Sequence, residues 1–192
     1  MNESRIIVRS AFSKPYSMLE DLSLLPSRGA KILDYECCLR DVHELRLQKY
    51  LALGYSTSID PFAFGINFVI NEISKDMTFD FISMNYTLNN IESPIERVLK
   101  VKEALKCLEK DGTLMVSTNT KEYIKKHDFK SSWTPIGDGY TIPTSGKFIT
   151  GISWLELSLM LMDIGLRIKL ISLCPAIILA TKSHTGQLKG EG

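Results

Sequence analysis

The sequence predicts an α/β protein: a mainly parallel, doubly wound sheet with helices on both faces and a C-terminal antiparallel hairpin. Short apolar segments alternate with amphipathic ones from residue 31 to residue 165, which is typical of parallel strands connected by helices. Two further apolar segments, residues 167–173 and 176–181, are joined only by Cys174 and Pro175. So short a connection permits only antiparallel pairing. We therefore expect an antiparallel strand at one edge of the sheet.

The bulk composition is that of an ordinary globular protein. The 192 residues are 44% hydrophobic and 23% charged, and the formal net charge is +1, which suits one domain with a sizeable core. A near-neutral charge argues against a strongly basic nucleic-acid interface, although a local patch could still contact DNA. The N-terminus lacks the pattern of a signal peptide, and no apolar stretch is long enough to span a membrane. We expect a cytoplasmic protein with an extension at 1–30, a domain at 31–182 and a flexible tail at 183–192.

Cysteine and histidine spacing gives no metal-binding pattern. The three histidines are scattered, and the four cysteines form no CxxC pair; they are Cys37, Cys38, Cys107 and Cys174. Metal sites need several ligands at short, repeated spacing. We therefore predict reduced thiols and no metal. A thiol nucleophile at Cys37 or Cys38 is an alternative to the more common role of a buried structural cysteine.

Caps and breakers mark the elements of the N-terminal half. Ser17 and Glu20 resemble a capping box, which predicts a short helix, and Gly54 stops a second helix. Residues 62–77 have no clear period, and a third strand or part of a helix would fit them. The expected elements are a helix at 17–25, a strand from residue 32, a helix at 41–53 and a strand at 55–60.

The C-terminal half contains the best-marked helix. Ser93 is a plausible N-cap, Pro94 suits the first helical position, Glu96 completes a capping box, and Gly112 follows the end. A second capping box opens a helix with an apolar face at residues 154, 157, 161 and 164. The expected elements are a strand at 79–84, a helix from 94, a strand at 113–118, a helix from 154 to 164 and the hairpin.

Residues 119–150 are long, polar and rich in turns. A segment of this kind is usually functional or partly ordered on its own. Trp133 and Tyr140 could stack on a flat substrate or anchor the segment. A basic cluster is most simply a solvated helix face, with contact to phosphates as the alternative; it comprises Lys121, Lys125, Lys126, His127 and Lys130.

The expected strands resemble those of class I S-adenosylmethionine-dependent methyltransferases. The matching segments are residues 32–35, 58–61, 80–86 and 112–116. Residues 85–97, 137–139 and 144–148 are also similar to the putative methyltransferases associated with DNA phosphorothioation. The resemblance implies a Rossmann-like methyltransferase fold, S-adenosylmethionine as cofactor, an unknown methyl acceptor and a protein partner in a DNA-modification or defence system. It leaves direct nucleic-acid binding open and implies no membrane contact.

The resemblance also implies a cofactor site, with one marked departure. In the family the first strand runs into Asp-x-Gly-x-Gly-x-Gly, where the glycines let the backbone approach the methionine part of the cofactor. Here Glu36, Cys38 and Arg40 replace all three glycines. A side chain at positive φ costs on the order of 1 kcal/mol or more, and its Cβ atom would intrude on the cofactor. The implied site residues are Asp34, Tyr35, Glu36, Cys37, Cys38, Asp60, Pro61, Asn85 and Tyr86.

Two of these positions carry alternatives. Asp60 would accept hydrogen bonds from the ribose hydroxyls, but Asp before Pro61 is also a common turn. Amino-group methyltransferases have Asn/Asp-Pro-Pro-aromatic where this chain has Asn85 and Tyr86 without prolines. This difference argues against typical adenine or cytosine methylation, and a tyrosine packed at a strand end is the alternative. Three functions stay open: an active methyltransferase that uses residues 119–150 as a lid or substrate wall, a methyltransferase-like binding or regulatory subunit without cofactor, and a protein for another nucleotide-type ligand.

Overall fold

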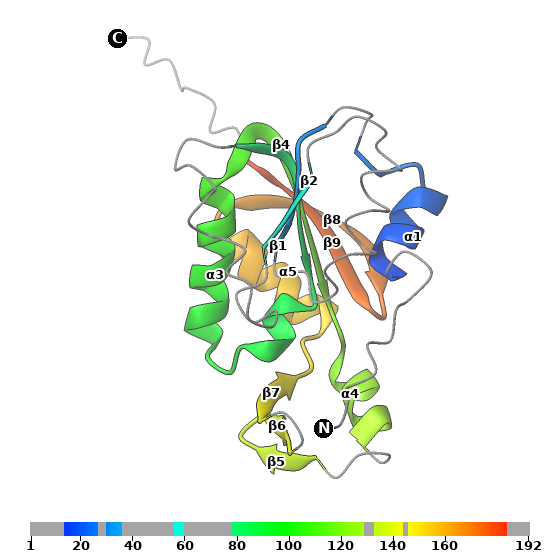
Figure 1. The fold of residues 1–192 in the computed structure, drawn as a ribbon, viewed down its shortest axis with the longest axis vertical. Helices are drawn as coiled ribbons and strands as arrows, with labels where there is room; N and C mark the ends of the chain where they lie inside the picture. Colours follow the sequence, from blue (N-terminus) through cyan, green and yellow to red (C-terminus); the bar gives the residue numbers. More distant parts are fainter. Residues whose placement is uncertain are drawn as a thin grey trace, which may run out of the picture.

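The computed structural model describes residues 14–26, 30–35, 56–59, 78–128, 133–143 and 146–183. Within them a six-stranded sheet has the order β2-β1-β3-β4-β9-β8, and a smaller sheet has the order β5-β6-β7 (Figure 1). The elements are α1 (Lys14–Asp21), β1 (Ile32–Tyr35), β2 (Ser56–Ile59), β3 (Phe79–Asn85), η1 (Thr87–Asn90), α3 (Pro94–Lys106), β4 (Leu108–Thr118), α4 (Lys121–Asp128), β5 (Thr134–Ile136), β6 (Gly139–Ile142), β7 (Lys147–Thr150), α5 (Trp154–Asp163), β8 (Leu166–Leu173) and β9 (Ala176–Lys182).

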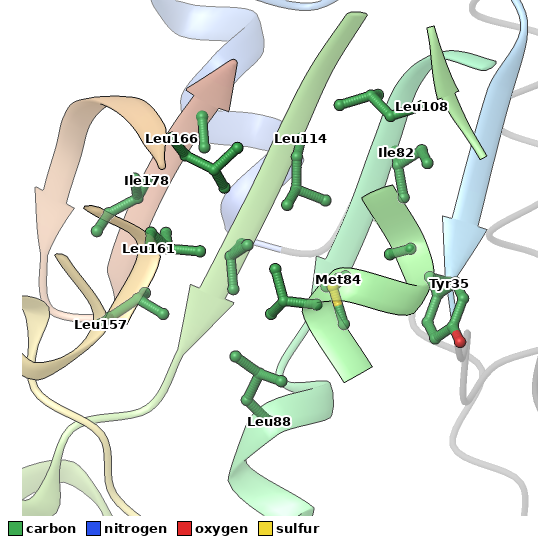
Figure 2. Close-up of a cluster of buried hydrophobic side chains, with 14 of the residues drawn as sticks. Tyr35, Ile82, Met84, Leu88, Leu108, Leu114, Leu157, Leu161, Leu166 and Ile178 are labelled. Atoms are coloured by element: carbon green, nitrogen blue, oxygen red, sulfur yellow. The ribbon is translucent and has the colours of Figure 1, made fainter. Parts of the chain in front are cut away.

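The predicted fold class is confirmed. Strands β2, β1, β3 and β4 pair in parallel, and β8 and β9 form the C-terminal antiparallel hairpin. Helices α3 and α5 cover one face of the sheet and α1 covers the other (Figure 1). Figure 2 shows side chains of α5 and of the sheet, among them Leu161, Leu166 and Ile178, gathered in the larger core.

The place of the hairpin in the sheet differs from the prediction. Strand β9 pairs antiparallel with β4 on one side and with β8 on the other, so the antiparallel strand is internal and β8 at the edge runs parallel to β4. The expected antiparallel edge strand was therefore wrong. Helices α3 and α5 pack on the same face of the sheet, and two neighbouring helices about 10 Å wide need about two strand spacings of 4.8 Å between their positions. Strand β8 thus lies two positions from β4, and β9 fills the space between them.

Helix α1 begins earlier than predicted. The expected helix started after Ser17, but α1 covers Lys14–Asp21, so Ser17 lies inside it and is not its cap. Tyr16 and Leu19 are fully buried against the sheet. The hydroxyl groups of Tyr16 and Ser83 are hydrogen-bonded across this interface. Tertiary packing of one helix face has overridden the local capping signal.

The predicted N-caps Ser93 and Ser153 are confirmed, although α3 is shorter than expected. The hydroxyl oxygens of Ser93 and Ser153 accept hydrogen bonds from the backbone N–H three residues later. Helix α3 ends at Lys106, and Gly112 lies inside β4. A Cβ atom at Gly112 would lie 2.8 Å from the Leu108 side chain and 3.0 Å from the Phe79 carbonyl oxygen. This glycine therefore permits close packing where the pairing of β3 with β4 is irregular.

The described residues of 119–150 form regular elements, which agrees with the prediction of a segment partly ordered on its own. It contains α4 and the antiparallel β5-β6-β7 sheet, which project from the end of the main sheet where β4 ends (Figure 1). The Trp133 and Tyr140 rings are 6.1 Å apart, centroid to centroid. Lys121, Lys125 and Lys126 are exposed on α4, as a solvated helix face predicts.

Several predictions fall outside the described residues. These are the helix at 41–53, the segment at 62–77 and most of the tail from 184 onward. Among the described helices, none combines the length and apolar character needed to cross a bilayer. The described part of the chain also holds no cluster of three or more His, Cys, Asp or Glu residues suited to a metal ion.

Candidate functional site

The strand order creates a switch point between β1 and β3. Strand β2, which follows β1 in the chain, pairs with one edge of β1, and the next strand, β3, pairs with its other edge. In open α/β sheets, ligands bind in the crevice outside the carboxyl ends of the two strands at such a point. Tyr35 ends β1 and pairs in register with Met84, so Asn85 and Tyr86 lie at the same rim. The structure therefore brings three of the predicted site residues together.

The predicted residues of the first strand take different positions. The Tyr35 side chain is only 5% exposed and packs in the core, with Lys100 Nζ 5.5 Å from its ring centroid. The Tyr35 carbonyl oxygen accepts a hydrogen bond from Thr87 Oγ1 at 3.4 Å. Only the backbone of Tyr35 is therefore available to the crevice, while the backbone of Asp34 pairs with Ser83 of β3. The remaining predicted residues lie outside the described part of the chain: Glu36, Cys37, Cys38, Asp60 and Pro61.

Asn85 is the most informative side chain at the rim. Its Oδ1 accepts a hydrogen bond from Ser117 Oγ at 3.1 Å. Its Nδ2 is buried and has no hydrogen-bond partner among the described residues. A buried donor without a partner costs about 1–3 kcal/mol. An acceptor atom on a ligand in the crevice would remove this cost.

Tyr86 turns the chain sharply at the end of β3. Its backbone is left-handed, with φ 61° and ψ 9°, a conformation that is uncommon for a bulky residue and marks functional sites in many proteins. Its N–H donates to the Ser117 carbonyl oxygen at 3.0 Å, and its own carbonyl oxygen accepts from Asn89 N–H at 3.3 Å. The turn leads directly into η1. The predicted alternative, a tyrosine packed at a strand end, agrees with its partly buried side chain.

Sequence reasoning missed Asn89, which joins three parts of the rim. The side chain is 1% exposed, and its Nδ2 donates to the carbonyl oxygens of Asn119 at 3.0 Å and Thr150 at 2.6 Å. Its Oδ1 accepts from Asn119 N–H at 2.9 Å. These partners are 30 and 61 residues away along the chain, so no local pattern could have revealed them.

The same region fastens the small sheet to the main one. Thr118 Oγ1 donates to the Ile152 carbonyl oxygen at 3.0 Å. A Cβ atom at Gly151 would lie 2.3 Å from the backbone N and Cα of Lys121, so the chain leaving β7 packs directly on the start of α4. Sheet β5-β6-β7 is thus held beside η1 at the carboxyl end of β4.

Comparison with known proteins identifies the fold. No family model and no curated protein matches the chain. Solved structures do match: PH0226 from Pyrococcus horikoshii OT3 (TM-score 0.59, 14% identity, 95% of this chain and 100% of that one) and plantazolicin methyltransferase BpumL with SAH (0.58, 15%, 88% and 80%). A SAM-dependent methyltransferase from Bacteroides fragilis with S-adenosyl-L-homocysteine also matches (0.57, 16%, 91% and 79%). The chain has the methyltransferase fold.

Two side chains, Glu122 and Cys107, have shifted pKa values, and they lie at opposite ends of the sheet. At the carboxyl end, hydrogen bonds from its own backbone N–H and from the Thr120 side chain lower the pKa of Glu122, at the start of α4. At the opposite end, burial and the nearby Glu103 raise the pKa of Cys107. Cys107 caps the C-terminus of α3, away from the crevice. Its thiol therefore has a structural role in packing.

Proposed function

We propose that the chain is an S-adenosylmethionine-dependent methyltransferase that acts in the crevice between β1 and β3. The supporting observation is the strand order β2-β1-β3-β4-β9-β8, with a switch point beside Asn85 Nδ2, which has no hydrogen-bond partner among the described residues. Two of the matching structures, BpumL and the Bacteroides fragilis enzyme, hold the demethylated cofactor. The same crevice is the natural site for the cofactor here.

The described residues would bind and orient the reactants. S-adenosylmethionine supplies a methyl group on a sulfonium, and transfer of such a group depends mainly on alignment of the acceptor. Asn85 Nδ2 would donate to a ligand oxygen or nitrogen at the rim. The hydrogen bonds of Asn89 would keep the β5-β6-β7 sheet beside the acceptor and limit the access of water. Asp60 would hold the ribose, and residues 36–40 would face the methionine part.

A cofactor-free binding or regulatory subunit is the second candidate. The observation that favours it is the replacement of the three family glycines by Glu36, Cys38 and Arg40. Glu36 would also bring a carboxylate near the carboxylate of the cofactor, a like-charge contact. In this case the fold would be retained for contacts with a partner. The two candidates make opposite predictions for cofactor binding.

Calorimetry and thermal unfolding with S-adenosylmethionine and S-adenosylhomocysteine test the proposal. Binding is expected, and a ligand at a hundredfold over its dissociation constant should stabilise the fold by about 2.7 kcal/mol. Asn85→Ala should weaken binding about tenfold, since a hydrogen bond from a buried donor is lost. The exposed neighbour Asn90→Ala serves as the matched control. Absence of binding for both compounds would refute the methyltransferase proposal.

A glycine-restored variant then separates a blocked pocket from a pocket lost altogether. The variant combines Glu36→Gly, Cys38→Gly and Arg40→Gly. If the native chain does not bind and this variant does, the second candidate is supported and the three side chains are the obstruction. If the native chain binds and the variant gains nothing, the loop has a different but functional shape.

We propose further that the partner belongs to a DNA-modification or defence system. The support is the similarity of residues 85–97, 137–139 and 144–148 to the phosphorothioation-associated group. The exposed Lys121, Lys125 and Lys126 lie on α4 at the carboxyl end of the sheet. Transfer of a labelled methyl group to duplex DNA, with and without phosphorothioate links, tests DNA as the acceptor. Incorporation into neither DNA would direct the search to protein or small-molecule acceptors.

A further inference from the structure

A serine hydroxyl holds one end of the Asn85 amide. Asn85 and Ser117 are register partners in the parallel pairing of β3 with β4, and the backbone N–H of Tyr86 donates to the Ser117 carbonyl oxygen at 3.0 Å. Ser117 Oγ donates to Asn85 Oδ1 at 3.1 Å. The two residues are therefore held together through both backbone and side chain at the carboxyl end of the sheet.

The burial of Ser117 decides which end of the amide it holds. Ser117 is 0% exposed, and the bond to Asn85 Oδ1 is the only hydrogen bond of its hydroxyl group within the described residues. If the amide were turned round, Nδ2 would donate to Ser117 Oγ, and both the hydroxyl proton and Oδ1 would lack a partner. The observed orientation leaves one unpaired group instead of two. It is the more stable one, because each unpaired buried polar group carries a cost.

The free end of the amide lies on the side of the switch point. Since Oδ1 faces Ser117 on β4, Nδ2 on the other branch of the planar amide is turned away from β4. On the opposite edge of β3, the pairing with β1 ends at Met84 and Tyr35, one residue before Asn85. Nδ2 is therefore turned toward the crevice between β1 and β3.

The other buried hydroxyl on this part of β3 has a partner. Ser83, two residues before Asn85, is also 0% exposed, and its hydroxyl group is hydrogen-bonded to that of Tyr16 on α1. In the described part of the chain, Asn85 Nδ2 is the only buried side-chain nitrogen or oxygen atom that lacks a hydrogen-bond partner. Because buried polar groups are normally paired in native proteins, this single exception indicates a donor that a ligand satisfies.

A fixed donor selects the chemistry of its ligand. An amide N–H pairs with a carbonyl or carboxylate oxygen, or with an unprotonated ring nitrogen. An amino group at the same place would set N–H against N–H and leave both donors unpaired. Sites with buried polar groups discriminate strongly against ligands that leave those groups unpaired.

We propose that Ser117 is a positioning residue that fixes the Asn85 amide as a donor, and that the crevice binds a hydrogen-bond acceptor there and not an amino group. The chemical class is a carbonyl compound, a carboxylate or a heteroaromatic ring with an unprotonated nitrogen. The identity of this ligand as a reactant of methyl transfer rests on the proposed function. Either the cofactor or the methyl acceptor then supplies the accepting group.

Two flat probes of similar size separate these chemistries. Quinoline carries a ring nitrogen that accepts, and indole carries an N–H that donates. The isotope-labelled whole chain is titrated with each probe to about 10 mM at pH 8, and the shift of the Tyr86 backbone amide signal gives the dissociation constant. We expect quinoline to bind about tenfold more tightly than indole and to move the Asn85 side-chain amide signal. Equal affinities, a preference for indole, or no shift with either probe overturns the proposal.

Three variants test the role of the serine. Ser117→Ala frees the amide to turn, so the preference for quinoline should fall below about threefold. Ser83→Ala is the matched control, because it also removes a fully buried hydroxyl group but leaves the Asn85 bond in place, and it should keep the preference. Asn85→Asp puts an accepting oxygen in the place of Nδ2 and should reverse the preference. A preference that survives Ser117→Ala overturns the positioning role, and circular dichroism checks that each variant folds.

S-adenosylhomocysteine separates this inference from the proposed function. Calorimetry measures its binding, and the quinoline titration is repeated at saturation. Loss of quinoline binding assigns the accepting group to the cofactor, and retained binding assigns it to the methyl acceptor. If the cofactor binds and no preference for quinoline exists, this inference fails and the proposed function stands. If the preference exists and the cofactor does not bind, the donor site stands and the proposed function fails.

Discussion

Replacement of Asn89 by leucine should destabilise the protein, because two buried backbone groups would lose their hydrogen-bond partner. Leucine has a similar volume but no hydrogen-bonding groups. Asn119 N–H and the Thr150 carbonyl oxygen would lose the Asn89 amide, whereas the Asn119 carbonyl oxygen keeps its bond from Ile152 N–H at 2.9 Å. Buried groups left without a partner cost about 1–3 kcal/mol each. For these two groups we expect the free energy of unfolding to fall by about 2–6 kcal/mol.

Urea unfolding followed by circular dichroism measures this change. The midpoint should fall while the dependence on denaturant stays constant, because the unfolded state exposes the same surface. Asn90→Leu is the matched control, since Asn90 is exposed and its single bond to the Tyr86 carbonyl oxygen is long, at 3.4 Å. A loss below 1 kcal/mol for Asn89→Leu, or an equal loss in both variants, would refute the idea that Asn89 fastens the rim.

Three further predictions follow from the same contacts. Gly151→Ala should lower stability by at least about 1–3 kcal/mol, because the new Cβ meets the Lys121 backbone at 2.3 Å; unchanged thermal unfolding would contradict this. Arg97→Met should cost about 3 kcal/mol or more, because the buried guanidinium donates to the carbonyl oxygens of Ile91 and Glu92; Arg97→Lys should recover only part of it. Alkylation by iodoacetamide at pH 8 should modify exposed Cys174 before Cys107, since a raised pKa leaves less thiolate on Cys107. Cys107 labelling should accelerate as the pH is raised further, and peptide mass spectrometry that finds Cys107 modified first would refute it.

Most of the elements could be predicted because their signals are local. The bonds from Glu96 N–H to Ser93 and from Glu156 N–H to Ser153 span three residues, and Gly165 ends α5 with φ at 85°. The order of these elements gave the fold class correctly. The failures were also physical: Ser17 has a capping pattern inside a helix, because burial of Tyr16 and Leu19 decided where α1 lies.

The candidate site could be predicted only in part. Asn85 was found because polar residues at the carboxyl end of a parallel strand face the ligand crevice. The Tyr35 side chain was included for the same reason, yet its ring packs in the core. Asn89 had no signal, because its role depends on two backbone segments that meet only in the folded chain.

The sequence by itself determined the strands of the main sheet, the N-caps of α3 and α5 and the antiparallel hairpin, because hydrophobic period and capping act over a few neighbouring residues. Only the tertiary structure decided that β9 lies between β4 and β8, that the β5-β6-β7 sheet lies beside η1, and that Leu155, Leu159 and Met162 of α5 stay exposed. These outcomes depend on which segments meet after long excursions of the chain. Spacing along the sequence does not record such meetings.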